Sequence, residues 1–182
     1  MILASHNSGT GENPSNLFAK LFSWIAKCQD KCLIDQYMSG VRFFDIRLKE
    51  YYGEYTIYHG LARYDMTFNN FLKSLNELRN NLGHTDDCII MVTYEGEMED
   101  YDEYPFYFYI KSFFDLYPTV KLGNVSVKKP EWKTIFSSPY HPNYIQNYPK
   151  IVGWKMLFPF PKIWNLFKKK VKSDGYVMED FV

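Results

Sequence analysis

The chain has 182 residues, of which 46% are apolar, and it carries 21 acidic and 21 basic side chains. A chain of this length buries roughly 70% of its unfolded surface, so we expect one folded domain, residues 1–182, that stays monomeric. Zero net charge gives no indication of a nucleic-acid partner, and no stretch reaches the ~18 apolar residues of a membrane span. No signal peptide precedes the first strand, so we expect a cytoplasmic location, or secretion if an N-terminal segment is missing.

The three cysteines, Cys28, Cys32 and Cys88, are too few for a disulfide framework. Cys28 and Cys32 lie on one expected helix, and no second pair of ligands follows them along the chain. We therefore interpret these two cysteines as ordinary helix-face residues and not as a zinc site.

Hydrophobic periodicity and turn residues predict that strands and helices alternate along the chain. Short apolar runs bounded by turn residues indicate buried strands. The segment Pro118–Lys150, rich in proline and tyrosine, gives no clear pattern. In chain order, the expected elements are a strand over Met1–Ser5, helices over Asn16–Cys32 and Leu33–Ser39, strands over Val41–Leu48 and Tyr55–His59, a helix over Phe68–Leu82, a strand over Cys88–Thr93, a helix over Pro105–Leu116, a strand over Ile151–Phe158, a helix over Trp164–Val171 and a strand over Tyr176–Val182.

The alternation of strands and helices predicts an α/β fold built on a parallel sheet. In a TIM-type (β/α) barrel, residues at the carboxyl ends of the strands meet at the active site. A complete barrel usually needs more than ~200 residues, so we expect a small barrel that is incomplete or distorted. Polar residues of chemical interest lie at or near the ends of the expected strands, namely His6, Asp45, Arg47, His59, Glu95 and Asp180.

Two histidines at strand ends suit a reaction that moves protons, because one can accept a proton from a nucleophile while the other donates one to a leaving group. Arg47 would bind phosphate oxygens and offset the charge that develops on them. A carboxylate beside one imidazole would fix its tautomer and strengthen it as a base. Metal-free cleavage of a phosphodiester requires such a set of groups. Each residue alone has a structural interpretation, so the prediction depends on their combination.

Five segments occur in the order expected of one enzyme family. They are Ala4–Thr10, Gly40–Arg47 with its Phe-Asp-Ile-Arg sequence, Tyr58–Gly60, the helix and strand of Thr67–Thr93, and Gly175–Val182. With these segments the chain resembles the X-domain family of phosphatidylinositol-specific phospholipase C, and in particular its bacterial, metal-independent branch.

The resemblance implies a role for each member of the cluster. His6 would be the general base on the inositol 2-hydroxyl, which attacks phosphorus, and His59 the general acid for the diacylglycerol oxygen. Arg47 would stabilise the charge of the transition state, Asp180 would pair with His6, and Asp45 would orient Arg47 or His59. The products would be diacylglycerol and a cyclic inositol phosphate, and neither a metal nor a cofactor would be required.

The resemblance also leaves alternatives open. A calcium-dependent branch of the family would hold its metal through the positions of Asn7, Asp45 and Glu95. Arg47 would repel a divalent cation there, by about 4 kcal/mol per unit-charge pair at about 4 Å and an effective dielectric constant of about 20. The metal-free branch has an inositol-binding lysine where this chain has Tyr94 and Glu95. We therefore expect Asn7, Tyr94 and Glu95 to contact the substrate, which is phosphatidylinositol or a related phosphodiester.

The segment Trp154–Lys172 interleaves aromatic residues with lysines, which suits peripheral contact with an anionic membrane surface. The same aromatic residues would equally serve to cover the barrel. Two other functions stay open, a catalytically weak relative that binds lipid head groups and a glycerophosphodiester hydrolase. The first has no need of two titrating histidines, and the second usually binds a metal through extra carboxylates that the sequence lacks in a matching pattern.

Overall fold

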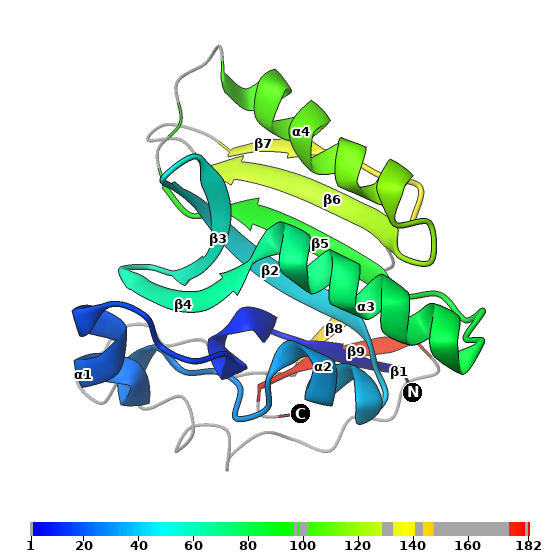
Figure 1. Ribbon diagram of the computed structural model, residues 1–182, viewed down its shortest axis with the longest axis horizontal. Coiled ribbons are helices and arrows are strands. Elements are labelled where there is room, and N and C mark those ends of the chain that lie inside the picture. The colour runs from blue at the N-terminus through cyan, green and yellow to red at the C-terminus, as the bar shows by residue number, and fades with distance from the viewer. Residues whose placement is uncertain are drawn as a thin grey trace.

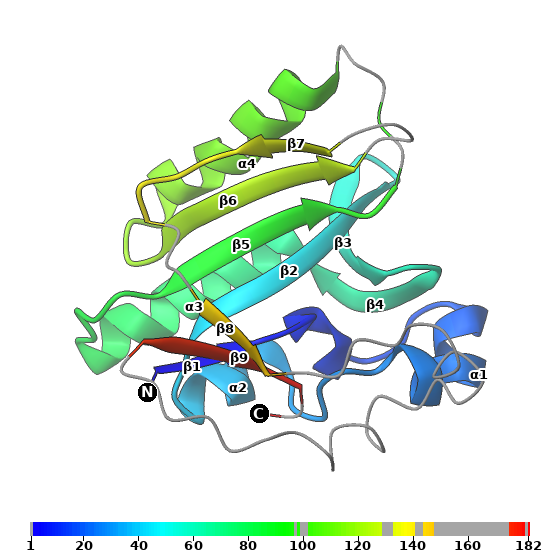
Figure 2. The same ribbon diagram turned by 180° about the vertical axis from the view of Figure 1, so that it is seen from behind.

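The computed structural model describes residues 2–96, 98, 102–128, 133–140, 144–147, 175–180 and 182. These residues form a mixed α/β fold in which nine strands join in one sheet. Helices α3 (Phe68–Leu82) and α4 (Glu103–Leu116) lie over one face of the sheet, as the two opposite views show (Figure 1, Figure 2).

Parallel strands form the frame of the sheet, in the order β8, β9, β1, β2, β5, β6. Strand β7 (Lys133–Phe136) pairs antiparallel with β6, and a hairpin of β3 (Glu54–His59) and β4 (Ala62–Thr67) pairs antiparallel with the end of β2. The two ends of the chain therefore meet in the sheet. The parallel strands are β1 (Ile2–Ser5), β2 (Val41–Tyr51), β5 (Ile89–Tyr94), β6 (Lys121–Lys128), β8 (Tyr144–Asn147) and β9 (Tyr176–Glu179).

The sheet is open across the described residues, because β7 and β8 are its end strands and no pairing joins them. A barrel closes only when every strand has a neighbour on both sides. The described residues therefore confirm the expected α/β class, but they form an open sheet and not a closed TIM-type barrel.

Alternation of side chains along β2 separates the core from the candidate site. Phe44, Ile46 and Leu48 are fully buried in the core between the sheet and its helices. Because successive side chains of a strand point to opposite faces, Asp45 and Arg47 lie on the other face. That face carries a second, smaller apolar cluster of Ala4, Phe43, Ile89 and Met178.

Helices α3 and α2 (Leu33–Met38) lie where the sequence predicts them. The Thr67 hydroxyl caps α3 by accepting a hydrogen bond from the Asn70 N–H at 3.3 Å. Gly83 ends α3 with φ of 64°, and Gly40 follows α2 with φ of 99°. Both helices thus end at glycines in the left-handed backbone conformation that glycine adopts without steric cost.

The expected helix over Asn16–Cys32 is too long. Helix α1 (Leu17–Ala26) ends two residues before Cys28, which lies in the following loop. Leu17 and Leu21, which are four residues apart on α1, are 72% and 59% exposed. Helix α1 therefore presents an apolar surface to solvent.

The unassigned segment Pro118–Lys150 contributes three strands, β6, β7 and β8, and β4 is a further strand that the sequence does not predict. The expected strand Ile151–Phe158, the expected helix Trp164–Val171 and the basic aromatic segment Trp154–Lys172 lie outside the described residues. Among the residues that are described, none of the helices combines the length and apolar character needed to cross a bilayer.

Candidate active site

Strand register brings His6 and Asp180 together. Strands β1 and β9 are parallel neighbours in which Ser5 lies opposite Glu179, so the residues that follow them emerge side by side. His6 Nδ1 lies 2.7 Å from Asp180 Oδ1, and the two side chains are only 12% and 2% exposed. An ionised carboxylate can only accept a hydrogen bond, so Nδ1 carries the hydrogen. Nε2 is then the ring nitrogen able to accept a proton.

Gln29 ties the ends of these two strands together. Its Nε2 donates to the His6 carbonyl at 2.8 Å and to the Glu179 carbonyl at 3.0 Å, while its Oε1 accepts from the Val182 N–H at 3.0 Å. Gln29 is fully buried. The positioning role of Gln29 is not visible in the sequence, because a single glutamine in an expected helix carries no signal of such contacts.

The loop that follows His6 packs closely against the sheet. Ser8 Oγ accepts a hydrogen bond from the Asp45 N–H of β2 at 3.0 Å. A Cβ at Gly9 would stand 2.2 Å from Ile57 Cγ2 of β3, so only glycine fits at this position. The small residues of the first motif therefore allow the loop to contact both strands that carry the other candidate residues.

His59, at the end of β3, faces the same loop. Its Nδ1 lies 2.7 Å from the Ala26 carbonyl oxygen, which can only accept, so Nδ1 carries a hydrogen. Its Nε2 lies 3.3 Å from Asn7 Nδ2 and accepts from that amide. Burial, with the positive charge of Arg47, lowers the pKa of His59 from its ordinary value of 6.5. In the free protein, His59 is therefore a neutral imidazole at neutral pH.

Arg47 lies between two carboxylates. Its Nη1 donates to Glu95 Oε1 at 2.9 Å, and its Nη2 lies 3.7 Å from Asp45 Oδ2. Burial disfavours the charge of the guanidinium, but Asp45 and Glu95 outweigh burial and raise the pKa of Arg47. The side chain is 29% exposed, so a permanently charged guanidinium can meet a ligand.

The proposed calcium ligands do not fit a calcium ion. Calcium takes several oxygen ligands and needs the negative charge of the carboxylates. Here the Arg47 guanidinium already compensates Asp45 and Glu95, and the Asn7 N–H occupies Asp45 Oδ2 at 3.2 Å. The absence of a metal requirement stays a prediction.

Cys28 belongs to this cluster although the sequence does not predict it there. Its sulfur accepts from Asn7 Nδ2 at 3.5 Å, and its side chain is buried. Its N–H donates to Thr10 Oγ1 at 2.9 Å, which fixes the loop after α1. The expected shared helix face of Cys28 and Cys32 is therefore wrong, because Cys32 instead precedes α2 as its N-cap residue.

Tyr94 does not join the cluster. Its ring packs edge-on against Tyr55 and Phe106, at centroid distances of 6.5 and 5.3 Å, in the core beneath α4. Arg47 lies on the opposite face of the sheet, so the structure does not bring Tyr94 to the cluster, and its contact with substrate stays a prediction. The other predicted residues form two contacting groups, His6 with Asp180, and Asn7 with Asp45, Arg47, His59 and Glu95. The two groups adjoin because His6 and Asn7 are neighbours in the chain.

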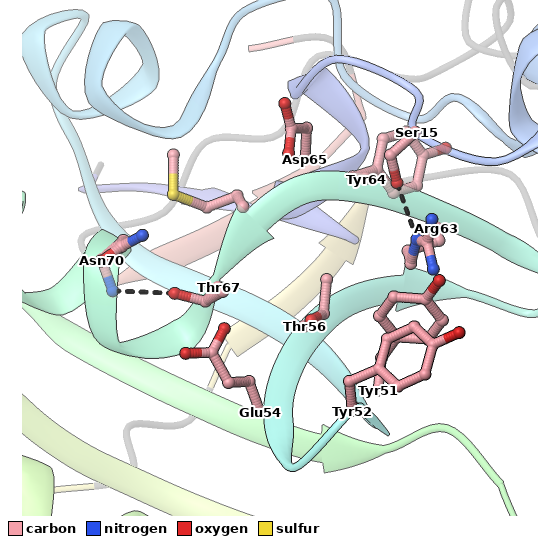
Figure 3. A pocket seen from close by; sticks show the side chains of 11 residues that line it. Ser15, Tyr51, Tyr52, Glu54, Thr56, Arg63, Tyr64, Asp65, Thr67 and Asn70 are labelled. Carbon is pink, nitrogen blue, oxygen red and sulfur yellow. Dashed lines mark hydrogen bonds between the residues drawn. The ribbon is translucent and has the colours of Figure 1, made fainter.

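A separate cavity of about 330 Å³ lies on the hairpin that carries His59 (Figure 3). Arg63 lies on one side of this cavity, stacked over the Tyr51 ring at 3.6 Å, and its Nε donates to Ser15 Oγ at 2.9 Å. Tyr52 has a left-handed φ of 52° and is 89% exposed at the turn. Arg63 thus fixes the hairpin to the N-terminal loop, and this attachment helps to position His59.

No family model matches the chain, and no curated protein matches it either. Solved structures do resemble it. The phosphatidylinositol-specific phospholipase C from Listeria monocytogenes gives a TM-score of 0.56 at 17% identity, over 82% of this chain and 62% of the Listeria chain. Two variants of the phosphatidylinositol-specific phospholipase C from Staphylococcus aureus give TM-scores of 0.64 and 0.57 at 13% and 14% identity, over 99% of this chain and 84% and 85% of theirs.

The chain thus spans less than two thirds of the length of the Listeria protein. At these identities the similarity concerns the fold alone. The mixed α/β fold of this chain is similar to the fold of these two bacterial proteins, with a sheet that stays open across the described residues.

Proposed function

We propose that the protein is a metal-independent phosphodiesterase that cleaves phosphatidylinositol or a related phosphodiester by attack of a neighbouring hydroxyl. The observation that carries this proposal is the His6–Asp180 pair, with its 2.7 Å contact, in one cluster with Arg47 and His59. A base, an acid and a fixed cation in a partly buried site are the groups that such a reaction needs. The fold of bacterial phosphatidylinositol-specific phospholipases C adds support.

In the proposed reaction, His6 Nε2 removes the proton of the inositol 2-hydroxyl, and the oxygen attacks phosphorus. Asp180 then stabilises the imidazolium through the Nδ1 hydrogen bond. Arg47 binds the non-bridging phosphate oxygens and offsets the charge of the transition state. His59 donates a proton to the diacylglycerol oxygen as it leaves, and a cyclic inositol phosphate remains.

The acid role of His59 requires a proton that the free protein holds weakly. Arg47 is one reason, because its positive charge lowers the pKa of the buried ring. A bound phosphodiester would compensate Arg47 and favour the imidazolium, so His59 would gain its proton as the substrate binds. The acid would therefore be loaded only when a phosphate is present.

Helix α1 supports a lipid as the substrate. Its exposed Leu17 and Leu21 form an apolar surface, and its last residue, Ala26, accepts the hydrogen bond from His59. An apolar helix face of this kind can insert into a bilayer surface. The proposed active site would then face the membrane that holds the substrate.

One observation favours the second candidate, a relative that binds lipid head groups but turns them over slowly. Asn7 donates to His59 Nε2, the atom that must carry the proton of the acid. A hydrogen bond to the neutral ring opposes its protonation. This contact predicts that the leaving group is protonated slowly. It does not predict that a different ligand is bound.

Cleavage of phosphatidylinositol in mixed micelles, followed by phosphorus NMR, tests the proposal. We expect a cyclic inositol phosphate that forms equally with and without a chelator, because no metal takes part. His6→Ala and His59→Ala should each reduce the rate by at least about 100-fold, since each removes a group that transfers a proton. Loss of activity with chelator, or near-normal activity of either variant, would contradict the assignment.

A further inference from the structure

Cys28 is a buried thiol that the proposed reaction does not use. It lies within the active-site cluster, where its sulfur accepts from Asn7 Nδ2 at 3.5 Å. Burial, with the nearby charge of Asp180, raises the pKa of this thiol well above its ordinary value. A soft sulfur donor beside the His6–Asp180 pair is unnecessary for phosphodiester cleavage, and its presence there calls for another explanation.

Three different donor types converge at this point. One imidazole nitrogen of His6, the sulfur of Cys28 and a carboxylate oxygen of Asp180 all lie within 4.8 Å of one another. The donor atoms around a tetrahedral zinc ion lie about 3.5 Å apart, given the usual zinc–ligand distances. Small side-chain movements would therefore close the three donors around one ion. Sulfur, nitrogen and oxygen donors together suit zinc better than calcium or magnesium.

The local charge also suits a divalent cation. Asp180 and Asp45 lie near enough to the Cys28 sulfur to disfavour its thiolate, and Arg47 lies near enough to favour it. Two negative charges and one positive charge therefore act on the position that a cation would take. Arg47 already pairs with Asp45 and with Glu95, so its repulsion of a cation at the Cys28 side is reduced. The calcium site considered above is disfavoured because two of its ligands, Asp45 and Glu95, are themselves the partners of Arg47.

The backbone holds the donors close together before any ion binds. Gln29, next in the chain to Cys28, donates to the His6 carbonyl at 2.8 Å and to the Glu179 carbonyl at 3.0 Å. The loop with Cys28 is thereby fixed to the ends of both strands that present the other two donors. Asn7, whose Nδ2 contacts the sulfur, has a buried Oδ1 without a hydrogen-bond partner among the described residues.

We propose that His6, Cys28 and Asp180 form an inhibitory site for zinc or another thiophilic divalent cation. On binding, the Cys28 thiol loses its proton to solvent and the sulfur forms a bond to the metal. The His6 ring stays neutral, with one nitrogen on the metal and its single proton on the other nitrogen. Neither nitrogen can then accept a proton, so His6 can no longer act as the proposed general base. The inhibitory part of this inference rests on the proposed function, whereas the metal site does not.

Cobalt(II) binding tests the site directly, because a cobalt–thiolate bond gives a charge-transfer absorption in the near ultraviolet. The wild-type protein should bind one cobalt ion with this absorption, and zinc should displace it. Cys28→Ala should abolish the absorption and weaken zinc binding by about 100-fold, since it removes a ligand. Cys32→Ala is the matched control and should leave both unchanged. Absorption that persists in Cys28→Ala, or its absence from the wild-type protein, would overturn the proposal.

Two further measurements guard against a misfolded variant. Cys28→Ser retains the size of the side chain, and circular dichroism and urea unfolding would establish that it folds; it too should lack the charge-transfer absorption. Because binding releases the thiol proton, the apparent zinc affinity of the wild-type protein should rise about tenfold per pH unit between pH values of about 6 and 8. A pH-independent affinity would contradict the role of the sulfur.

An activity measurement separates this inference from the proposed function. Zinc should inhibit diester cleavage by the wild-type protein, a chelator should restore it, and Cys28→Ala should resist inhibition relative to its own metal-free rate. If the protein shows the cobalt–thiolate absorption but cleaves no diester, the metal site is supported and the proposed function is refuted. Diester cleavage that zinc leaves unchanged, in a protein without the absorption, would refute the metal site alone.

Discussion

Replacement of Asp180 by asparagine tests the central pair of the candidate active site. The substitution retains the shape of a side chain that is 2% exposed, but it removes the charge that faces His6 Nδ1 at 2.7 Å. A hydrogen bond to a charged group contributes about 1.5 to 3 kcal/mol. If this stabilisation applies to the imidazolium of the transition state, kcat should fall by about tenfold to about 150-fold, since ~1.4 kcal/mol corresponds to a factor of ten.

The assay is the rate of cyclic inositol phosphate formation by phosphorus NMR, with urea unfolding as a check that Asp180→Asn remains folded. Asp65→Asn provides a matched control, because Asp65 is exposed and lies on β4 away from the cluster. Its rate should equal that of the wild-type protein. A folded Asp180→Asn variant within about twofold of the wild-type rate would refute the reasoning, because Asp180 would then do nothing for His6 in the transition state.

Three further predictions concern the surrounding residues. Because the pKa of His59 is lowered in the folded protein, this ring binds a proton more readily in the unfolded chain. The free energy of unfolding should therefore fall as pH drops below about 6.5. His59→Gln should reduce this pH dependence in urea titrations at pH values of about 5 to 7. Arg47→Lys should lower kcat by about tenfold or more, because an ammonium cannot bind two phosphate oxygens side by side, and equal rates would contradict that role. Leu17→Ser with Leu21→Ser should weaken binding to phosphatidylinositol vesicles in a sedimentation assay. Leu116→Ser should not, because Leu116 is similarly exposed, at 67%, but lies on α4; equal losses would contradict membrane contact through α1.

Local sequence signals predict the elements whose boundaries depend on nearby residues. The Thr67 cap and Gly83 define α3 within a few residues of the chain, and the apolar run of β5 needs no partner to be identified. By contrast, β6 pairs with β5, and β7 pairs with β6, and the sequence alone does not reveal these pairings. The proline and tyrosine content of the segment Pro118–Lys150 hides them.

Helix α1 illustrates a second limit of prediction from the sequence. Apolar residues at helical spacing indicate which side chains share a face, but not what that face contacts. Leu17 and Leu21 share the face as the spacing predicts, yet both are exposed. Tertiary packing determines which face of α1 is buried, and it buries Ala19 instead.

The sequence by itself determined which residues are candidates for the proposed proton transfer and their order along the chain. His6, His59 and Asp180 are recognisable because they end or follow strands, and Arg47 because it lies within one, and strand position is a local property. Tertiary structure decided the partners. Strand register set the His6–Asp180 pair, side-chain alternation on β5 removed Tyr94 from the site, and an early end of α1 brought Cys28 into it. Such contacts join segments far apart in the chain, so their distances are fixed only when the sheet has assembled.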